Sequence, residues 1–144
     1  MPTTSVGIGN MSKTVSTLLE GPLHHVTNVE NRDAILRDGL KAKDGSWHGV
    51  KWKRQVFFVT TRIGAYEMAN NFIHETRGEY IFIPVDPAKM SGRLRPDKNY
   101  DQGVWAAADV PREAIIDVEP VNEEFFESAE FLNYMGVDEG DELT

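Results

Sequence analysis

The sequence predicts an α+β domain in which short strands alternate irregularly with amphipathic helices. Segments of strand composition, such as "QVFFVT" and "EYIFIPVD", are only six to eight residues long. Helical periodicity recurs between them, most clearly in "TRIGAYEMANNFIH". There are too few strand–helix–strand units for a doubly wound sheet, and no glycine-rich dinucleotide fingerprint follows a strand. The 144 residues agree with one globular domain.

The first elements are expected in residues 1–40. Residues 1–21 are predicted to be a flexible lead with a short helix capped by Ser12, and residues 22–27 a short strand. Thr27 and Glu30 have the spacing of a capping box, which predicts that a helix begins there. Gly39 is placed to end that helix in the left-handed conformation.

The middle of the chain continues with a long polar segment. Residues 41–53 contain two tryptophans and no periodicity, which predicts a binding loop. A buried strand at 55–60 and a helix at 61–74 follow. Residues 79–86 form a further strand, in which Pro84 indicates an edge or a strand end.

The last elements are shorter and more acidic. Residues 87–102 are predicted to be a second loop, 103–111 a short strand and turn, and 113–121 the last strand. An acidic amphipathic helix is expected at 122–135, followed by a frayed tail. The predicted organisation is therefore a lead at 1–21, a folded domain at 22–120 and an acidic C-terminal helix and tail at 121–144.

Charge is distributed unevenly along the chain. The net charge is −8, but nine of the 23 acidic residues follow Val118, where there is no Lys or Arg. Residues 1–118 thus hold 14 acids against 15 bases. Basic residues gather between Arg37 and Arg54, either as a surface for a phosphate-bearing ligand or as a solvated loop.

Several classes of site are excluded by composition or spacing. The absence of cysteine rules out disulfides, thiolate zinc sites and a cysteine nucleophile, and it fits a cytoplasmic location. No apolar run approaches the length of a membrane span, and no secretory signal pattern is visible. No metalloprotease motif, nucleophile elbow or phosphate-binding loop occurs, and we expect no metal. Any chemistry must therefore use His, Arg, Thr, Tyr and Gln side chains.

The adjacent histidines of "PLHHVT" cannot have the same role. Neighbouring side chains of a strand point to opposite faces, so His24 and His25 face opposite ways, and Thr27 shares the face of His25. A histidine and a hydroxyl on one face make a polar pair at the edge of a cleft. The alternative is a half-buried, satisfied His25 with a Thr27 that only caps the helix.

Five segments taken in order resemble a known superfamily. They are "LHHVT", "ILRDGL", "VFFVTTRIGAYEMA", "YIFIPVDPAKM" and "GVWAAADVPREAI". Their order resembles the NAD-using ADP-ribosyltransferase superfamily, and within it the RNA 2′-phosphotransferases, over residues 22–118. The resemblance implies a split pair of small antiparallel sheets with flanking helices that hold NAD+ between them. The winged-helix half that usually precedes the phosphotransferase catalytic half is not recognisable.

The resemblance also implies roles for particular residues. His25 would contact the nicotinamide ribose or the adenosine part, Thr27 would hold the pocket backbone, and Arg54 would bind phosphate. Further NAD+ contacts are implied for Gly39, Thr60 and Tyr66, the last as a stacking ring.

Where most protein-modifying members carry a late glutamate, this chain has Gln102, or Gly103 if the register slips by one residue. Glutamine can orient a ribose hydroxyl but cannot act as a base. The arginine that phosphotransferases carry shortly before "GVW" is also absent.

These patterns predict an NAD+-dependent ADP-ribosyl (or 2′-phosphoryl) transferase. Cleavage of the nicotinamide–ribose bond passes through an oxocarbenium-like state, so the enzyme must hold the pyrophosphate, orient the ribose and exclude water. The acceptor would be a protein, a nucleic acid or a nucleotide. Two alternatives stay open: a non-catalytic protein that binds NAD+ or an ADP-ribose ligand, and an interaction protein that works through its acidic C-terminal helix.

Overall fold

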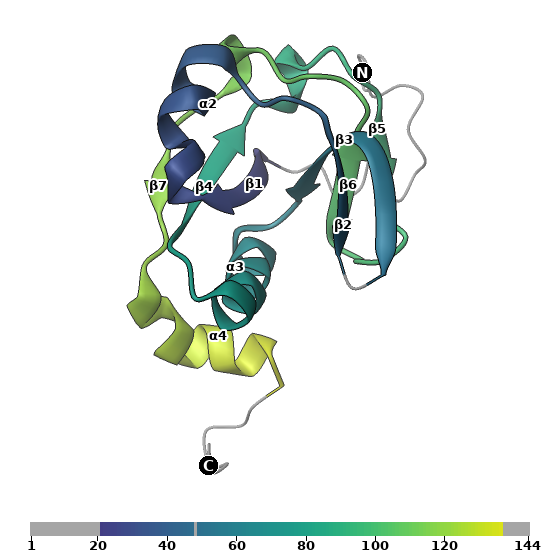
Figure 1. Ribbon diagram of the computed structural model, residues 1–144. Helices are drawn as coiled ribbons and strands as arrows, with labels where there is room; N and C mark the ends of the chain where they lie inside the picture. The colour runs from purple at the N-terminus through teal and green to yellow at the C-terminus, as the bar shows by residue number, and fades with distance from the viewer. Residues whose placement is uncertain (1–20, 48, 137–144) are drawn as a thin grey trace.

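An antiparallel sheet of seven strands organises the computed structural model, which describes residues 21–47 and 49–136. The strand order is β5-β6-β3-β1-β4-β7, and β2 pairs with β3 outside this path (Figure 1). The fold is therefore α+β with an antiparallel sheet, as the sequence predicts. The lead and helix expected within residues 1–20, and the tail expected at 137–144, lie outside the described residues.

The strands are short except for one. Their bounds are β1 Leu23–Asn28, β2 Lys43–Trp47, β3 Val50–Val59, β4 Tyr80–Val85, β5 Leu94–Pro96, β6 Gly103–Ala106 and β7 Glu119–Pro120. The α-helices are α2 Arg32–Asp38, α3 Arg62–Thr76 and α4 Ala129–Tyr134. Short 3-10 helices are η2 Val29–Asn31, η3 Pro87–Lys89, η4 Arg112–Ala114 and η5 Glu123–Glu127. Among the described helices, none is long and apolar enough to cross a membrane.

The sheet consists of two halves that meet at one position. β1 and β4 are paired along six residues, whereas β1 and β3 are paired only between His24 and Val59. One half is β1-β4-β7, and the other is β5-β6-β3 with the β2 hairpin. Beyond the His24–Val59 pair, β1 and β3 separate, and this separation creates the space for a cleft.

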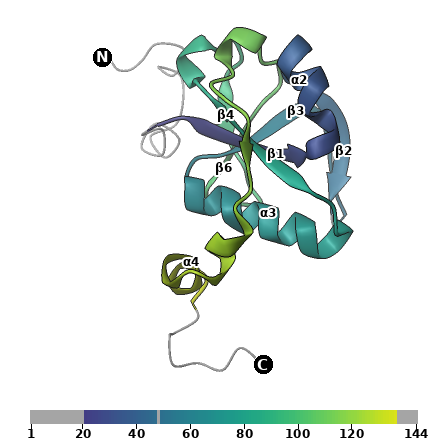
Figure 2. The ribbon, with the colours of Figure 1, turned by 90° about the vertical axis from the view of Figure 1, so that its left-hand side faces the viewer.

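Two apolar clusters pack on the two faces of the sheet. Alternation along β4 assigns Ile81, Ile83 and Val85 to one cluster and Phe82 to the other. The first cluster includes Ile35 of α2, and the second includes residues of α3 and α4. Helices α2 and α4 accordingly lie at opposite ends of the molecule, with α3 between them (Figure 2).

Helix α2 lies where the sequence predicts a helix, but the geometry of both its ends differs from the prediction. The first turn is the 3-10 helix η2, and its cap is Asn28, whose Oδ1 accepts the Glu30 N–H at 2.9 Å. The Thr27–Glu30 capping box is therefore wrong. Gly39 ends the helix as predicted, with φ +79°, but its ψ of −170° is extended rather than left-handed helical. This geometry directs Leu40 into a bridge with Val110.

Helix α3 agrees with its prediction. Thr61 caps it through the Gly64 N–H at 3.0 Å, and Ala65, Tyr66 and Ala69 are buried.

The predicted loop at 41–53 is wrong, because these residues form β2 and the first part of β3. The predicted loop at 87–102 contains η3 and β5. The last strand is only the two residues of β7, and the predicted helix at 122–135 is broken at Ser128 into η5 and α4. Ser128 starts α4 anew, since its Oγ accepts the Phe131 N–H at 3.2 Å.

Candidate functional site

A cleft of about 310 Å³ lies where β1 and β3 separate. One wall is β1 with α2, and the other is the β2–β3 hairpin. Polar and charged residues that line it are His25, Thr27, Asn31, Asp38, Lys41, Lys43, Asp44 and Gln55, together with Trp52. This volume is at the lower end of the range for small-molecule sites.

His25 is fixed at the floor of this cleft in a defined tautomer. Its Nδ1 lies 2.8 Å from the Phe57 carbonyl oxygen, so Nδ1 carries the proton and donates it. Burial lowers the pKa of His25, the Phe57 hydrogen bond opposes that shift, and the charge of Lys43 adds to it. The ring is therefore neutral at pH 7, which makes Nε2 a hydrogen-bond acceptor.

Thr27 and Gly39 also line the cleft, and each has a second structural task. The Thr27 hydroxyl accepts a hydrogen bond from Asn31 Nδ2 at 2.9 Å, which ties β1 to the first turn of η2. Gly39 passes so close to the next segment that a Cβ there would lie 2.2 Å from the Val110 carbonyl oxygen. Thr27 therefore shapes the cleft wall through its side chain, and Gly39 shapes it through its backbone.

Both carboxylates that line the cleft have a hydrogen-bond or ion-pair partner, whereas one of its lysines has no ion pair among the described residues. Asp38 pairs with Arg37 at 3.0 Å, and Asp44 accepts the Arg54 N–H at 2.8 Å. Lys41 pairs with Asp109 at 3.8 Å. Lys43 has no ion pair among the described residues, and its charge reaches His25. The cleft thus offers one neutral imidazole, a hydroxyl, amides and a cation, a set that suits a polar ligand with an anionic group.

Arg54 does not line the cleft. It is exposed at a β-bulge, where Lys53 and Arg54 lie opposite Asp44, and its φ of +47° is unusual for a residue with a side chain. The Asp44 hydrogen bond holds this strained backbone. Arg54 therefore shapes the hairpin that carries Lys43, and it is not among the residues that line the cleft with His25.

The remaining predicted residues gather at the N-terminal end of α3. The Thr60 N–H and hydroxyl both donate to the Gln102 carbonyl oxygen, at 2.8 and 3.0 Å. The Gln102 side chain accepts from the Thr61 hydroxyl and donates to the Tyr134 hydroxyl. Tyr66 is buried against Phe82 and two phenylalanines of η5. The structure thus brings together His25, Thr27 and Gly39, and it places Arg54, Thr60, Tyr66 and Gln102 outside the cleft.

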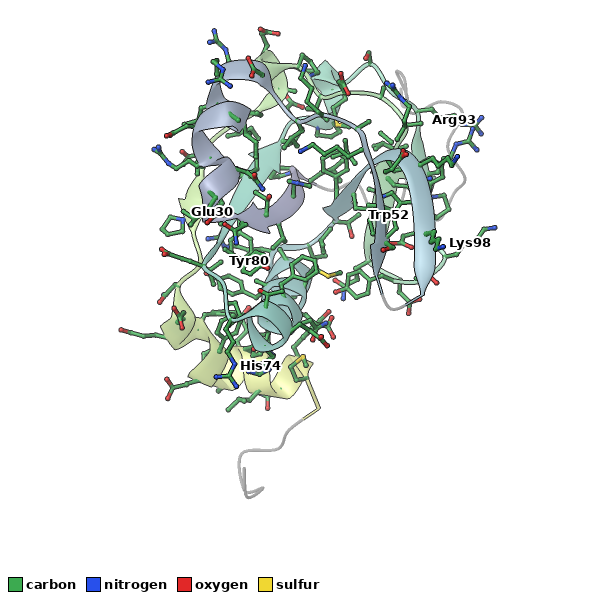
Figure 3. All side chains as sticks on the ribbon, in the orientation of Figure 1. Glu30, Trp52, His74, Tyr80, Arg93 and Lys98 are labelled. Atoms are coloured by element: carbon green, nitrogen blue, oxygen red, sulfur yellow. The ribbon has the colours of Figure 1, made fainter. Side chains whose placement is uncertain are left out.

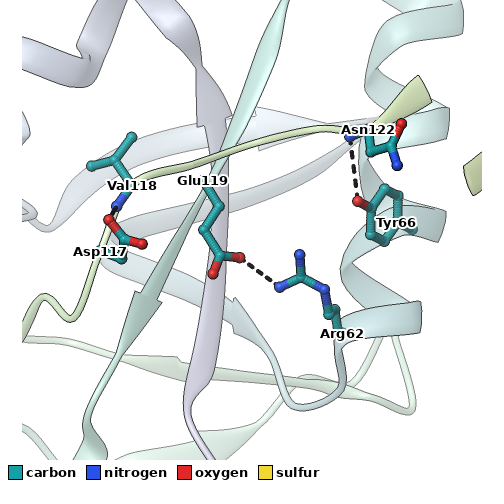
Figure 4. Close-up of polar contacts among 6 residues, drawn as sticks. All are labelled: Arg62, Tyr66, Asp117, Val118, Glu119 and Asn122. Carbon is teal, nitrogen blue, oxygen red and sulfur yellow. Dashed lines mark hydrogen bonds and ion pairs between the residues drawn. The ribbon is translucent and has the colours of Figure 1, made fainter. Parts of the chain in front are cut away.

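His24 lies on the opposite face, beside an ion pair that fastens β7 to α3. Arg62 Nη1 and Glu119 Oε1 are 2.5 Å apart (Figure 4). The Tyr66 hydroxyl accepts the Asn122 N–H at 3.3 Å next to them. His24 is 6 % exposed, and its Nδ1 has no hydrogen-bond partner among the described residues. This face is therefore a structural clamp, and the opposite orientation of the two histidines agrees with the sequence.

Sequence reasoning gave no role to Gln55 or Asn31, and it included Lys43 only among the basic residues between Arg37 and Arg54 that could form a surface for a phosphate-bearing ligand. Lys43 lay in the segment interpreted as a loop. Gly49, which lies between the paired residues Trp47 and Val50, was the available hairpin signal, since a glycine with positive φ suits a tight turn between strands.

Comparison of the chain with family models, with curated proteins and with solved structures gives no match. Among the described residues, no group of three or more His, Asp and Glu side chains is placed to hold a metal ion. The candidate site therefore rests on the geometry of the cleft.

Proposed function

We propose that the protein is an NAD+-dependent transferase that binds NAD+ in the cleft between β1 and β3. It transfers the ADP-ribosyl group of NAD+ to an acceptor, or it removes a 2′-phosphoryl group from one. The observation that carries this proposal is a neutral, oriented His25 beside Thr27 in the separation of an antiparallel sheet. Such a separation is what an ADP-ribosyltransferase-like split sheet requires. The acceptor is a protein, a nucleic acid or a nucleotide.

Within this proposal the cleft residues bind and orient. His25 Nε2 accepts a hydrogen bond from a ribose hydroxyl, while the Phe57 carbonyl keeps the ring in place. Lys43 lines the cleft and supplies the cation for the pyrophosphate. When the bond between ribose C1′ and nicotinamide breaks, nicotinamide leaves with the electron pair and becomes neutral. The acceptor then bonds to C1′, and the proton that it loses goes to solvent.

Non-catalytic binding of NAD+ or of an ADP-ribose ligand is the second candidate. This candidate is favoured because the acidic side chains of the cleft and the Gln102 amide already have hydrogen-bond or ion-pair partners. Both carboxylates that line the cleft are engaged, and the Gln102 amide is held by Thr61 and Tyr134. A binding protein needs neither a base nor a late glutamate.

Titration calorimetry with NAD+ and an assay for released nicotinamide test both candidates. Wild-type protein should bind NAD+, and His25→Ala should weaken binding about tenfold, the value of one hydrogen bond made in a partly buried site. His74→Ala is the matched control, because His74 is exposed on α3 and does not line this cleft. Circular dichroism verifies that each variant is folded.

The outcomes separate the candidates. Nicotinamide release that depends on His25 supports the transferase, and binding without release supports the binding protein. No heat of binding at millimolar NAD+, or equal weakening in both variants, overturns the cleft as the NAD+ site.

A further inference from the structure

A second concave site lies at the C-terminal end of α3. Its volume is about 690 Å³, and it is lined by residues from the end of α3, the start of β4, and the segment that leads from β7 into η5. Among the described residues, none lines both this site and the cleft between β1 and β3. Tyr80 and His74, which both line it, lie apart from Trp52 of the β2–β3 hairpin (Figure 3). We call this site the α3–β7 groove.

The groove exists because β7 covers only part of β4. Ile81 pairs with Pro120 and Phe82 pairs with Glu119, whereas Tyr80 has a strand partner only on β1. Proline has no N–H group to extend the ladder, and the chain continues into η5 after it. The edge of β4 at Tyr80 is therefore not covered by β7.

Apolar side chains line a large part of the groove. Ile81 is 5 % exposed, and Ile73 and Val121 are half-buried. The Tyr80 ring packs on a phenyl ring of α3 with the centroids 5.4 Å apart, and its hydroxyl oxygen lies 2.7 Å from that of Thr76. A wall that is fixed in this way before a ligand arrives lowers the ordering cost of binding.

Charged side chains of both signs line the same groove without pairing. Arg77, Glu79 and Glu123 are all exposed there. None of the three has an ion-pair partner among the described residues, although opposite charges line the same site. The negative end of the α3 macrodipole adds to the two carboxylates. The groove thus offers one cation and, separate from it, an excess of negative charge.

Arg77 has a backbone conformation that favours glycine. Its φ is +58° and its ψ is 24°, and it forms the C-cap of α3, where its N–H donates to the Ile73 carbonyl oxygen at 2.7 Å. Glycine is the usual residue in this conformation at a helix end, yet here Gly78 follows one position later. An arginine at this position costs free energy, because its Cβ crowds the backbone. The same conformation makes Arg77→Gly a substitution that the backbone tolerates.

Separate charges of opposite sign beside an apolar surface are complementary to a zwitterion that has an apolar body. A carboxylate pairs with a guanidinium group, and an ammonium group pairs with carboxylates near the C-terminal end of a helix. The excess of negative charge disfavours a phosphate-bearing ligand, and the arginine disfavours a simple cation. We propose that the α3–β7 groove binds an apolar α-amino acid, with its carboxylate at Arg77, its ammonium group at Glu79 and Glu123, and its side chain on the apolar surface.

This site goes beyond the proposed function and does not depend on it. Because the groove and the cleft share no lining residue among those described, amino-acid binding is measured without NAD+. A failure of amino-acid binding is therefore distinguishable from a failure of NAD+ binding.

Titration calorimetry with L-leucine and L-phenylalanine tests the proposal. Leucinamide lacks the carboxylate and N-acetyl-leucine lacks the ammonium group, so each leaves a charge of the groove without a partner. Both analogues should bind at least about tenfold more weakly than leucine. In NMR spectra, leucine should shift the amide signals of Gly78 and Val121 and leave that of His25 unchanged.

Two sets of variants test the charges. Arg77→Gly should weaken leucine binding at least about tenfold in a protein that stays folded, and Arg77→Lys should retain most of the affinity. Glu123→Gln should also weaken binding. Its matched control is Glu124→Gln, because Glu124 is exposed and adjacent but does not line the groove. Circular dichroism verifies the fold of each variant.

Three results would overturn the proposal: no binding of either amino acid at millimolar concentration, equal affinity for leucine and its two analogues, or equal weakening by Glu123→Gln and Glu124→Gln. Tighter binding of leucinamide than of leucine would also overturn it and would reassign the groove to a cationic ligand.

Discussion

His24 and His25 show how far one position along a strand separates two identical side chains. His25 lines a cleft and has a carbonyl partner, whereas His24 is buried and its Nδ1 has no partner among the described residues. The strand period alone predicts that they face opposite ways. Which of them faces a cleft depends on the neighbours of β1, because the sheet separates on one side only.

Both histidines make stability depend on pH. Burial lowers the pKa of His24, Arg62 adds to this shift, and Glu119 opposes it. Burial also lowers the pKa of His25. Since both native pKa values lie below the ordinary 6.5, the unfolded state binds more protons below that pH. The free energy of unfolding should therefore fall as the pH drops from about 6.5 through the native pKa values.

Replacing His24 by Leu should remove its part of this pH dependence. An apolar side chain leaves no unpaired nitrogen, so we expect the free energy of unfolding at pH 7 to rise by about 1 kcal/mol. Urea unfolding at pH 7 and at about pH 5.5 measures both effects. His74→Leu on the exposed surface of α3 is the control, and a decrease of more than about 1 kcal/mol at position 24 would contradict the prediction.

Whether Thr27 caps the helix or lines a pocket could be decided only from the tertiary structure. The sequence allowed a helix cap or a pocket wall, and the cap turned out to be Asn28. The helical segment starts with the 3-10 turn η2, whose N-cap is Asn28. A Thr27–Glu30 capping box would require the helix to start one residue earlier, with Thr27 as its N-cap. Thr27 is consequently free to line the cleft.

At the scale of elements, the end of α2 is the most constrained turn near the site. Gly39 combines a positive φ with a close approach to Val110 and Arg112. Gly39→Ala should lower the free energy of unfolding by about 2–5 kcal/mol, since backbone strain and overpacking add.

Gly49→Ala is the matched control for Gly39→Ala. Gly49 has a φ of +83° but no atom within 4 Å of a Cβ, so only the strain of about 1–2 kcal/mol applies. Equal destabilisation of the two variants, measured by urea unfolding, would show that the close approach to Val110 is unimportant.

The β2–β3 hairpin was the element least visible in the sequence. Residues 43–47 lack an apolar alternation because β2 pairs on one side only and is largely exposed. The bulge at Arg54 breaks the period of β3 just before its buried part. A polar, irregular strand has the composition of a loop, although its pairing is fixed by the neighbouring strand.

At the scale of the whole molecule, the C-terminal segment completes the second core cluster. Phe131 of α4 is 3 % exposed and packs with Phe125, Phe126 and Tyr134. Tyr134 and Tyr100 both donate to Glu67 Oε1, at 2.9 and 2.7 Å, which joins α4 and the β5–β6 loop to α3. The acidic helix is thus part of the folded unit.

Phe131→Ala should destabilise the entire domain. Removal of a buried phenyl ring costs about 3–5 kcal/mol, and fluorescence and circular dichroism should report one shared transition at lower urea. Met135→Ala, at an exposed position of the same segment, should change stability by less than about 0.5 kcal/mol. Separate transitions for the two signals would instead mark α4 as an independent unit.

The sequence by itself determined the α+β class, the positions of α2 and α3, the glycine stop of α2 and the opposite faces of the two histidines. These features depend on periodicity, caps and backbone preferences within a few residues. Only the tertiary structure decided that β1 and β3 separate after one pair, that the charge of Lys43 lowers the pKa of His25, and that Gln102 bonds to Tyr134. Those interactions join residues 18 to 35 positions apart along the chain. Pairing and register over such distances follow from the packing of the whole sheet, which local patterns do not contain.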